Sequence, residues 1–88
     1  MSAPLKYIRR RKSYIFFRNV VDDMKGDGVQ SQTIMKVCVR IYQRMAELNW
    51  LGNNKATLTG WESMNQVFID VLKVTQELAD SVYEEISK

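Results

Sequence analysis

The residues best suited to chemistry form one basic and aromatic run near the start of the chain. Five cations stand between positions 6 and 12, and Ser-Tyr-Ile-Phe-Phe-Arg follows directly at 13–18. Lysine and arginine neutralise phosphates and release their counterions, while tyrosine and phenylalanine stack on unpaired bases. The run therefore predicts contact with a nucleic-acid strand or a groove edge. The alternative is a solvated basic helix end whose aromatic rings belong to the core.

A second basic feature is a row of three cations, Lys36, Arg40 and Arg44. They are spaced by four, so a helix would place them on one face. Solvated surface commonly carries such rows, but two basic features in the same half of the chain favour one electropositive surface. The cations that we expect to contact nucleic acid, or else an acidic protein surface, are Lys6, Arg9, Arg10, Arg11, Lys12, Arg18, Lys36, Arg40 and Arg44.

Charge is divided unequally between the two halves of the chain. Residues 1–44 hold ten Lys and Arg against three Asp and Glu, whereas residues 45–88 hold three against seven. The halves therefore carry +7 and −4, within a total of +3. Such a split concerns partners and self-association rather than the fold, and we expect the chain to form a homo-oligomer.

The composition argues against catalysis. The sequence contains no histidine, which removes the commonest general base and the nucleophile pairs that depend on it. The four glycines match neither the P-loop nor the dinucleotide spacing. The acids of the second half fall on a polar helix face, where nothing separates their pKa values for acid–base work. We expect neither an enzyme nor a cofactor.

A metal site is not expected either. Residues 22–28 contain acids and glycines, but a calcium loop beginning at Asp23 would place Lys25 third and Ile34 twelfth, where a glutamate is required. One cysteine cannot build a zinc or iron–sulfur site. Cys38 lies in an apolar row, which indicates a small core residue rather than a reactive thiol.

The lone cysteine also excludes an internal disulfide, and this favours a reducing, cytoplasmic setting. No apolar run is long enough to span a membrane, and no signal peptide is evident. A basic helix with aromatic residues can lie on anionic lipid, but so small a domain needs its apolar residues for a core. We do not expect membrane association.

The spacing of apolar residues predicts a first helix over 13–25, preceded by a basic extension over 1–12 that is helical or frayed from Pro4. Tyr7, Tyr14 and Val21 fall at heptad-like spacing, and so do Phe17 and Met24. Gly26-Asp27-Gly28 is the clearest break in the chain. A β-strand over 14–21 is the alternative, because that segment is rich in good strand formers.

A second helix is expected from a cap at Ser31 to about Leu51, where Gly52-Asn53-Asn54 follows. Its apolar residues recur at steps of three and four, and they are Ile34, Val37, Cys38, Ile41, Tyr42, Met45 and Leu48. Met35 and Val39 widen this face beyond half of the circumference. So apolar a helix is either central to the fold or shared with a second subunit.

The third predicted helix is the longest. Thr59 and Glu62 have the spacing of a capping box, so we expect the helix to run from Gly60 to about Ile86. Its apolar face consists of Met64, Val67, Phe68, Val71, Leu72, Leu78, Ala79, Val82 and Ile86.

Together these patterns predict one all-α domain over residues 1–88, a small three-helix bundle with a long C-terminal amphipathic helix, assembled as a dimer. The function that we expect is that of a small, non-enzymatic, nucleic-acid-associated regulatory protein. The alternative is a protein-binding adaptor or inhibitor, such as an accessory factor of a phage or mobile element, acting through its basic surface or its third helix.

Overall fold

The computed structural model describes the backbone of residues 4–48 and 54–87, and the side chains of residues 4–48, 59–82, 84 and 85. All regular structure within these residues is helical, which confirms the predicted all-α class. The elements are α1 (Leu5–Ile8), α2 (Lys12–Gly26), α3 (Ser31–Glu47), α4 (Asn54–Val67), the π-helix η1 (Phe68–Leu72) and α5 (Gln76–Ser87). The described residues therefore hold more elements than the three helices predicted.

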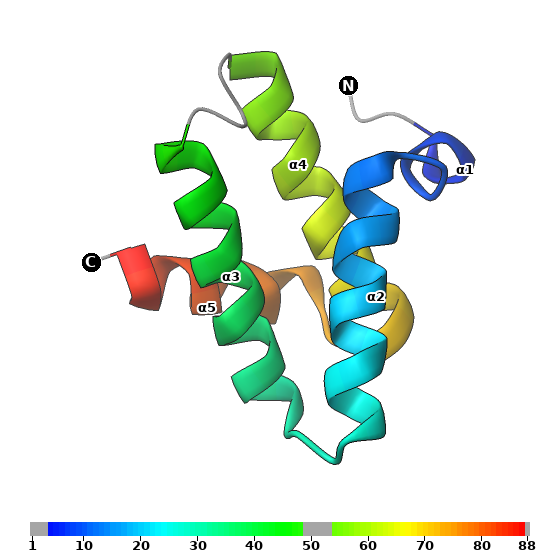
Figure 1. The fold of residues 1–88 in the computed structure, drawn as a ribbon, viewed down its shortest axis with the longest axis vertical. Helices are drawn as coiled ribbons and strands as arrows, with labels where there is room; N and C mark the ends of the chain where they lie inside the picture. The colour runs from blue at the N-terminus through cyan, green and yellow to red at the C-terminus, as the bar shows by residue number, and fades with distance from the viewer. Residues whose placement is uncertain (1–3, 49–53, 88) are drawn as a thin grey trace.

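The helices surround one apolar interior. α2 and α3 diverge from the turn that joins them, α4 lies between their other ends, and α5 crosses behind α3 (Figure 1). α4 packs mainly against α2, and α5 packs mainly against α3. The short α1 lies beside the start of α2 and contacts α4 (Figure 1). The α1–α2 corner is thus held against the C-terminal half of the chain.

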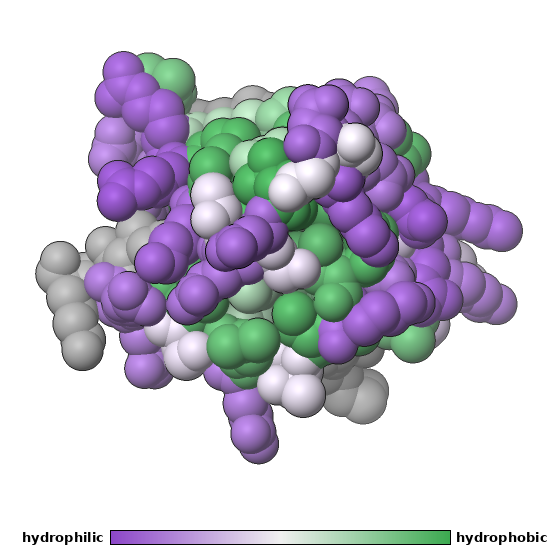
Figure 2. Space-filling view, turned by 90° about the horizontal axis from the view of Figure 1, so that it is seen from below, coloured by the Kyte–Doolittle hydropathy of each residue, from purple (hydrophilic) through white to green (hydrophobic). Residues whose placement is uncertain are grey.

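The core takes residues from every helix. Its largest fully buried side chains include Phe17, Ile34, Met35, Met64 and Phe68. Seen from below, at the end where α2 and α3 meet, hydrophobic residues gather in the middle of the face and hydrophilic ones surround them (Figure 2). Burial of this apolar surface is the main favourable term in folding.

The first predicted helix agrees with α2, and its buried face includes Tyr14, Phe17 and Val21 as predicted. Tyr7 is the exception, because it is exposed on the separate helix α1. A turn over residues 9–10 divides the predicted basic extension from α2. The expected face therefore does not continue through that extension.

The predicted break after α2 is confirmed, and its hydrogen bonds explain the choice of glycine. Gly28 has a φ of 82°, a left-handed conformation that glycine adopts without strain. Its N–H donates to the Lys25 carbonyl (3.0 Å), and the Val29 N–H donates to the Met24 carbonyl (3.1 Å). This pair of bonds is the Schellman motif, which satisfies carbonyls left unpaired at a helix end. Val29 and Met24 both pack against the core.

Helix α3 buries Ile34, Cys38 and Tyr42 on the predicted face. Gln30, rather than Ser31, is its N-cap, and no side chain caps it. The helix ends at Glu47, and Leu48 is 64% exposed rather than buried, because it lies beyond the last helical turn. The predicted end near Leu51 lies outside the described residues.

The single helix predicted over 60–86 is wrong in two respects. Helix α4 already begins at Asn54, so Thr59 lies inside a helix and does not cap it. At the other end, Lys73 adopts a left-handed conformation (φ 59°), which ends η1. The hydroxyl of Thr75 then accepts the Leu78 N–H (3.2 Å) and caps α5. The C-terminal half is therefore α4 with η1, a short connection, and α5.

Candidate nucleic-acid interface

The α1–α2 corner carries most of the predicted basic run. Ile8 is buried at the end of α1 and fixes the corner to the core. Arg11 then adopts an extended conformation before α2 begins, so the chain changes direction between the two helices. On a continuous helix, residues two apart would lie on different faces. Because the chain turns here, neighbouring arginines can instead point in different directions, and arginines two apart can point the same way. The corner therefore separates the arginines into two groups.

Arg9 and Arg11 face the C-terminal half of the chain. Arg9 donates from Nε to Oδ2 and from Nη2 to Oδ1 of Asp70, both at 2.9 Å. Arg11 Nη1 donates to Oε1 of Glu62 and to the carbonyl of Thr59, both at 3.2 Å. These side chains hold the corner against α4 and η1, so they are structural within this fold. The expectation that both face a partner is not supported by these contacts.

Asp70 is the centre of a larger network. Its Oδ2 also accepts the hydroxyl of Tyr14 (2.6 Å), and its Oδ1 accepts Nε2 of Gln66 (2.9 Å). Hydrogen bonds from Arg9, followed by those from Tyr14 and Gln66, hold the pKa of the Asp70 carboxyl well below its usual range. Burial and the bond to Asp70 raise the pKa of the Tyr14 hydroxyl. A carboxylate so stabilised is a poor proton acceptor, and it serves to hold the corner.

Arg18 extends this network along α2. Its Nη1 donates to the hydroxyl oxygen of Tyr14 (2.9 Å), and its Nε lies 3.8 Å from Oδ2 of Asp22. Half of the Arg18 side chain remains exposed. Arg18 is thus partly engaged within the fold.

Lys6, Arg10 and Lys12 form the second group at the corner. All three are exposed, and none makes an ion pair within the described part of the chain. Lys6 Nζ lies 5.3 Å from the centroid of the Tyr7 ring, which is itself 53% exposed. Three cations and one accessible aromatic ring therefore remain at the surface, on a support that the inward arginines hold in place. We call these four residues the basic corner.

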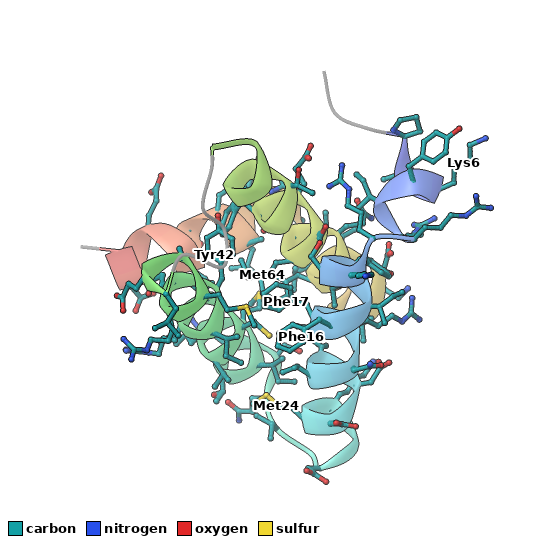
Figure 3. All side chains as sticks on the ribbon, turned by 45° about the horizontal axis from the view of Figure 1, so that its top comes forward. Lys6, Phe16, Phe17, Met24, Tyr42 and Met64 are labelled. Atoms are coloured by element: carbon teal, nitrogen blue, oxygen red, sulfur yellow. The ribbon has the colours of Figure 1, made fainter. Side chains whose placement is uncertain are left out.

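The row on α3 is divided in the same way. Lys36 Nζ lies 3.7 Å from Oε1 of Glu85, and Arg44 Nη1 lies 3.1 Å from Oε2 of Glu47. Arg40 is exposed and makes no ion pair with the residues that the structure describes. Helices α1 and α3 lie at opposite sides of the molecule (Figures 1 and 3). The basic corner and the α3 row are thus two separate places rather than one electropositive surface.

Beside this row, α3 carries a shallow apolar hollow of about 440 Å³. Val37, Ile41 and Met45 form its apolar lining, and Arg40 and Arg44 complete it. These three apolar residues were expected on the buried face, but they are only partly buried, whereas Ile34 and Cys38 are buried in the core that α3 shares with α2, α4 and α5. The sequence did indicate this hollow, because the apolar face predicted for this helix is wider than half of its circumference.

Sequence reasoning missed the roles of Glu62, which was expected in a capping box, and of Asp70, which was assigned to a polar helix face. Both form ion pairs with the basic extension, 51 and 61 residues away in the chain. The opposite charges of the two halves were the available signal, although they do not specify which residues meet. Burial raises the pKa of the Cys38 thiol to about 12, in keeping with a core residue.

Within the described residues, no three acidic or cysteine side chains gather closely enough to hold a metal ion. No described helix is both long and apolar enough to cross a membrane. Comparison with protein-family models, with curated proteins and with solved structures finds no match for this chain.

Proposed function

We propose that the protein is a non-enzymatic nucleic-acid-associated protein that binds a single strand at the basic corner. The supporting observation is that Lys6, Arg10 and Lys12 are all exposed at the α1–α2 corner, where Lys6 also lies beside the exposed ring of Tyr7. Cations spaced along a strand bind phosphates, and an exposed ring can stack on a base that is not paired. A regulatory role and the cytoplasmic setting predicted from the lone cysteine belong to the same proposal.

The test measures binding of a labelled single-stranded oligonucleotide at several salt concentrations. Arg10→Gln combined with Lys12→Gln should weaken binding and lower the slope of log K against log salt by about 0.7 for each lost phosphate contact. Arg40→Gln is the matched control, because Arg40 is an equally unpaired cation on the other side of the molecule. Equal affinity and slope in the double variant and the parent would refute the proposal.

This design spares Arg9 and Arg11, because replacing either would break the contacts to Asp70 or Glu62 and confuse unfolding with lost binding. A circular dichroism spectrum and a urea unfolding curve of each variant establish that the fold is intact. The free energy of unfolding of each surface variant should stay within about 0.5 kcal/mol of that of the parent.

A second candidate function is supported by the hollow on α3. Apolar side chains flanked by arginines suit an acidic, partly apolar protein segment, which is the adaptor or inhibitor alternative, or a second copy of this chain. Sedimentation of the parent and of Met45→Glu tests self-association. A parent dimer that the substitution dissociates supports this candidate, whereas a monomeric parent at high micromolar concentration argues against the dimer.

A further inference from the structure

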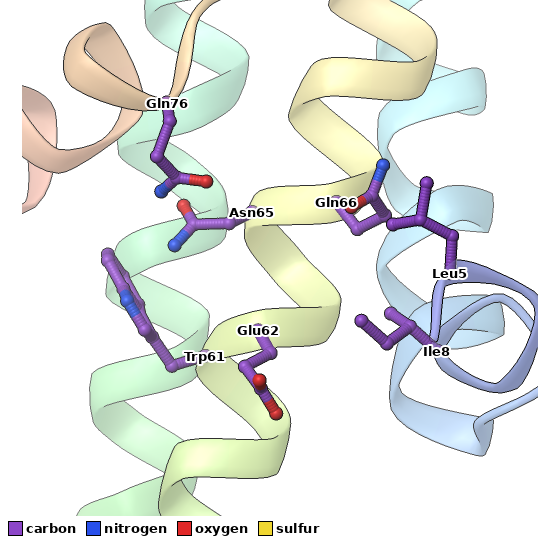
Figure 4. A pocket seen from close by; sticks show the side chains of 7 residues that line it. All are labelled: Leu5, Ile8, Trp61, Glu62, Asn65, Gln66 and Gln76. Carbon is purple, nitrogen blue, oxygen red and sulfur yellow. The ribbon is translucent and has the colours of Figure 1, made fainter. Parts of the chain in front are cut away.

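A half-open pocket lies between α4, α1 and the start of α5 (Figure 4). Its volume of about 270 Å³ is near the lower limit of roughly 300 Å³ for typical ligand sites. Leu5 and Ile8 of α1 line one side, and Trp61 of α4 lies on the other (Figure 4). Because Lys6 and Tyr7 lie between Leu5 and Ile8 in the chain, the same short helix contributes to the pocket and to the basic corner.

The polar residue at the centre of the pocket is unusual. Asn65 is only 5% exposed, and its Oδ1 has no hydrogen-bond donor within the described residues. A buried polar atom without a partner costs about 1–3 kcal/mol. In Figure 4 the Asn65 amide lies beside Gln76, whose exposed side chain instead donates from Nε2 to Oδ1 of Asp80 (3.1 Å). A ligand donor that displaces Gln76 would satisfy this oxygen.

Glu62 provides a second acceptor in the pocket. Its carboxylate can only accept hydrogen bonds when ionised, and its Oε1 already accepts Nη1 of Arg11 (3.2 Å), so Oε2 is the oxygen left for a ligand. Gln66 already uses a donor outside the pocket, from Nε2 to Oδ1 of Asp70 (2.9 Å), and Gln76 does so with Asp80. The pocket therefore suits a small ligand that presents N–H donors.

The walls suit a planar ligand. Trp61 is held by a tilted contact with Tyr42, whose ring centroid is 5.8 Å away. Stacking of a base on an aromatic ring contributes about 1–3 kcal/mol. A flat ring with an exocyclic amino group, stacked on Trp61, would present that amino group to the unpaired oxygen of Asn65.

We propose that this pocket binds one amino-bearing base of a single nucleic-acid strand whose phosphates lie on the basic corner. The inference rests on the proposed function and adds base selectivity to it. Cytosine carries an amino group where thymine carries a carbonyl oxygen, so the acceptors favour cytosine over thymine. Adenine and guanine also carry amino groups and belong to the preferred class.

The experiment compares three labelled oligomers about ten residues long, within the usual range of single-strand sites. One contains deoxycytidine, one contains thymidine, and one is an abasic sugar-phosphate chain with equal charge. The parent should bind the cytidine oligomer about tenfold more tightly than the abasic chain, and severalfold more tightly than the thymidine oligomer.

Asn65→Leu tests the pocket itself. This variant loses the unpaired acceptor but keeps a side chain of similar size, so it should fold, and its stability should equal or exceed that of the parent. It should bind the abasic chain as the parent does, while the preference for cytidine over thymidine disappears. Asn19→Leu, on the exposed surface of α2, is the matched control and should retain the preference.

The outcomes separate this inference from the proposed function. Equal binding of all three oligomers by the parent would overturn the base pocket and leave phosphate binding at the corner intact. Binding of none would overturn both. Competition with cytidine monophosphate distinguishes the source of the base, because a strand site binds the free nucleotide far more weakly than the oligomer. Equal affinity for the two would overturn the assignment to a strand.

Discussion

Replacing Asp70 with asparagine tests the network that holds the α1–α2 corner. The Asp70 carboxylate accepts hydrogen bonds from Arg9, Tyr14 and Gln66. Asparagine keeps the size of the side chain but removes the charge, and it places an amide N–H₂ where a donor already points. The corner should therefore lose stability without losing its shape.

The magnitude follows mainly from the bond donated by Tyr14, a buried residue, because this bond is partly buried and only 2.6 Å long. A hydrogen bond to a charged group contributes about 1.5–3 kcal/mol, so Asp70→Asn should lower the free energy of unfolding by about 2 kcal/mol. The guanidinium of Arg9 is half exposed, and solvent screening keeps its share small. For a domain of this size, the melting temperature should fall by roughly 8–16 °C.

The pH dependence of this loss has a definite sign. The folded-state pKa of Asp70 lies below that of the unfolded chain, which is about 3.9 for an aspartate. Between these two values the unfolded state binds more protons, so the stabilisation present at neutral pH is lost as the pH falls. The parent should therefore lose more stability than the variant below about pH 5, and the difference between them should narrow.

Urea unfolding followed by circular dichroism, at neutral pH and at several acid values, measures both effects. Asp23→Asn is the control, because Asp23 is exposed and its replacement removes the same charge. The control should differ from the parent by no more than about 0.5 kcal/mol. The reasoning would be refuted if Asp70→Asn behaved like the control, or if its difference from the parent were unchanged by acid.

Two further predictions concern the turn and the core. Gly28→Ala should lower the free energy of unfolding by about 1–2 kcal/mol, because Gly28 has a φ of 82°. Gly26→Ala should raise it by about 0.4–1 kcal/mol, because Gly26 is helical and its new methyl group would meet no other atom within 4 Å. Urea unfolding of both variants checks the opposite signs, and equal signs would contradict the assigned turn. Cys38 is fully buried, and its thiol pKa is raised to about 12. A thiol reagent at neutral pH should therefore label Cys38 only as the protein unfolds. Rapid labelling without urea would contradict that burial.

The all-α class and the α2–α3 turn could be predicted because both depend on local rules. The period of the apolar residues identified α2 and α3, and glycine identified the left-handed turn between them. The break before α5 also left a signal in the sequence. The apolar row of the third predicted helix has a polar residue, Thr75, where its period requires an apolar one, and this hydroxyl caps α5. The polar residue in this row was therefore evidence against one unbroken helix.

The candidate site was less predictable, because its geometry depends on contacts between distant parts of the chain. Arg9, Arg10 and Arg11 are chemically identical, yet two meet acids of the C-terminal half and one faces outward. The pocket at Asn65 likewise forms only where α1, α4 and the start of α5 meet. The sequence shows how many such residues there are, but it does not show which of them face the rest of the fold and which face solvent.

The charge split between the halves therefore has two separable meanings. Part of it is internal, because Arg9, Arg11 and Lys36 each lie within ion-pair distance of an acid from the other half. Cations used in this way are already neutralised, and they add little to the attraction of a distant anion. Only cations without such partners can pair with a strand at full strength. Binding at the basic corner should thus depend on Lys6, Arg10 and Lys12 far more than on Arg9 and Arg11.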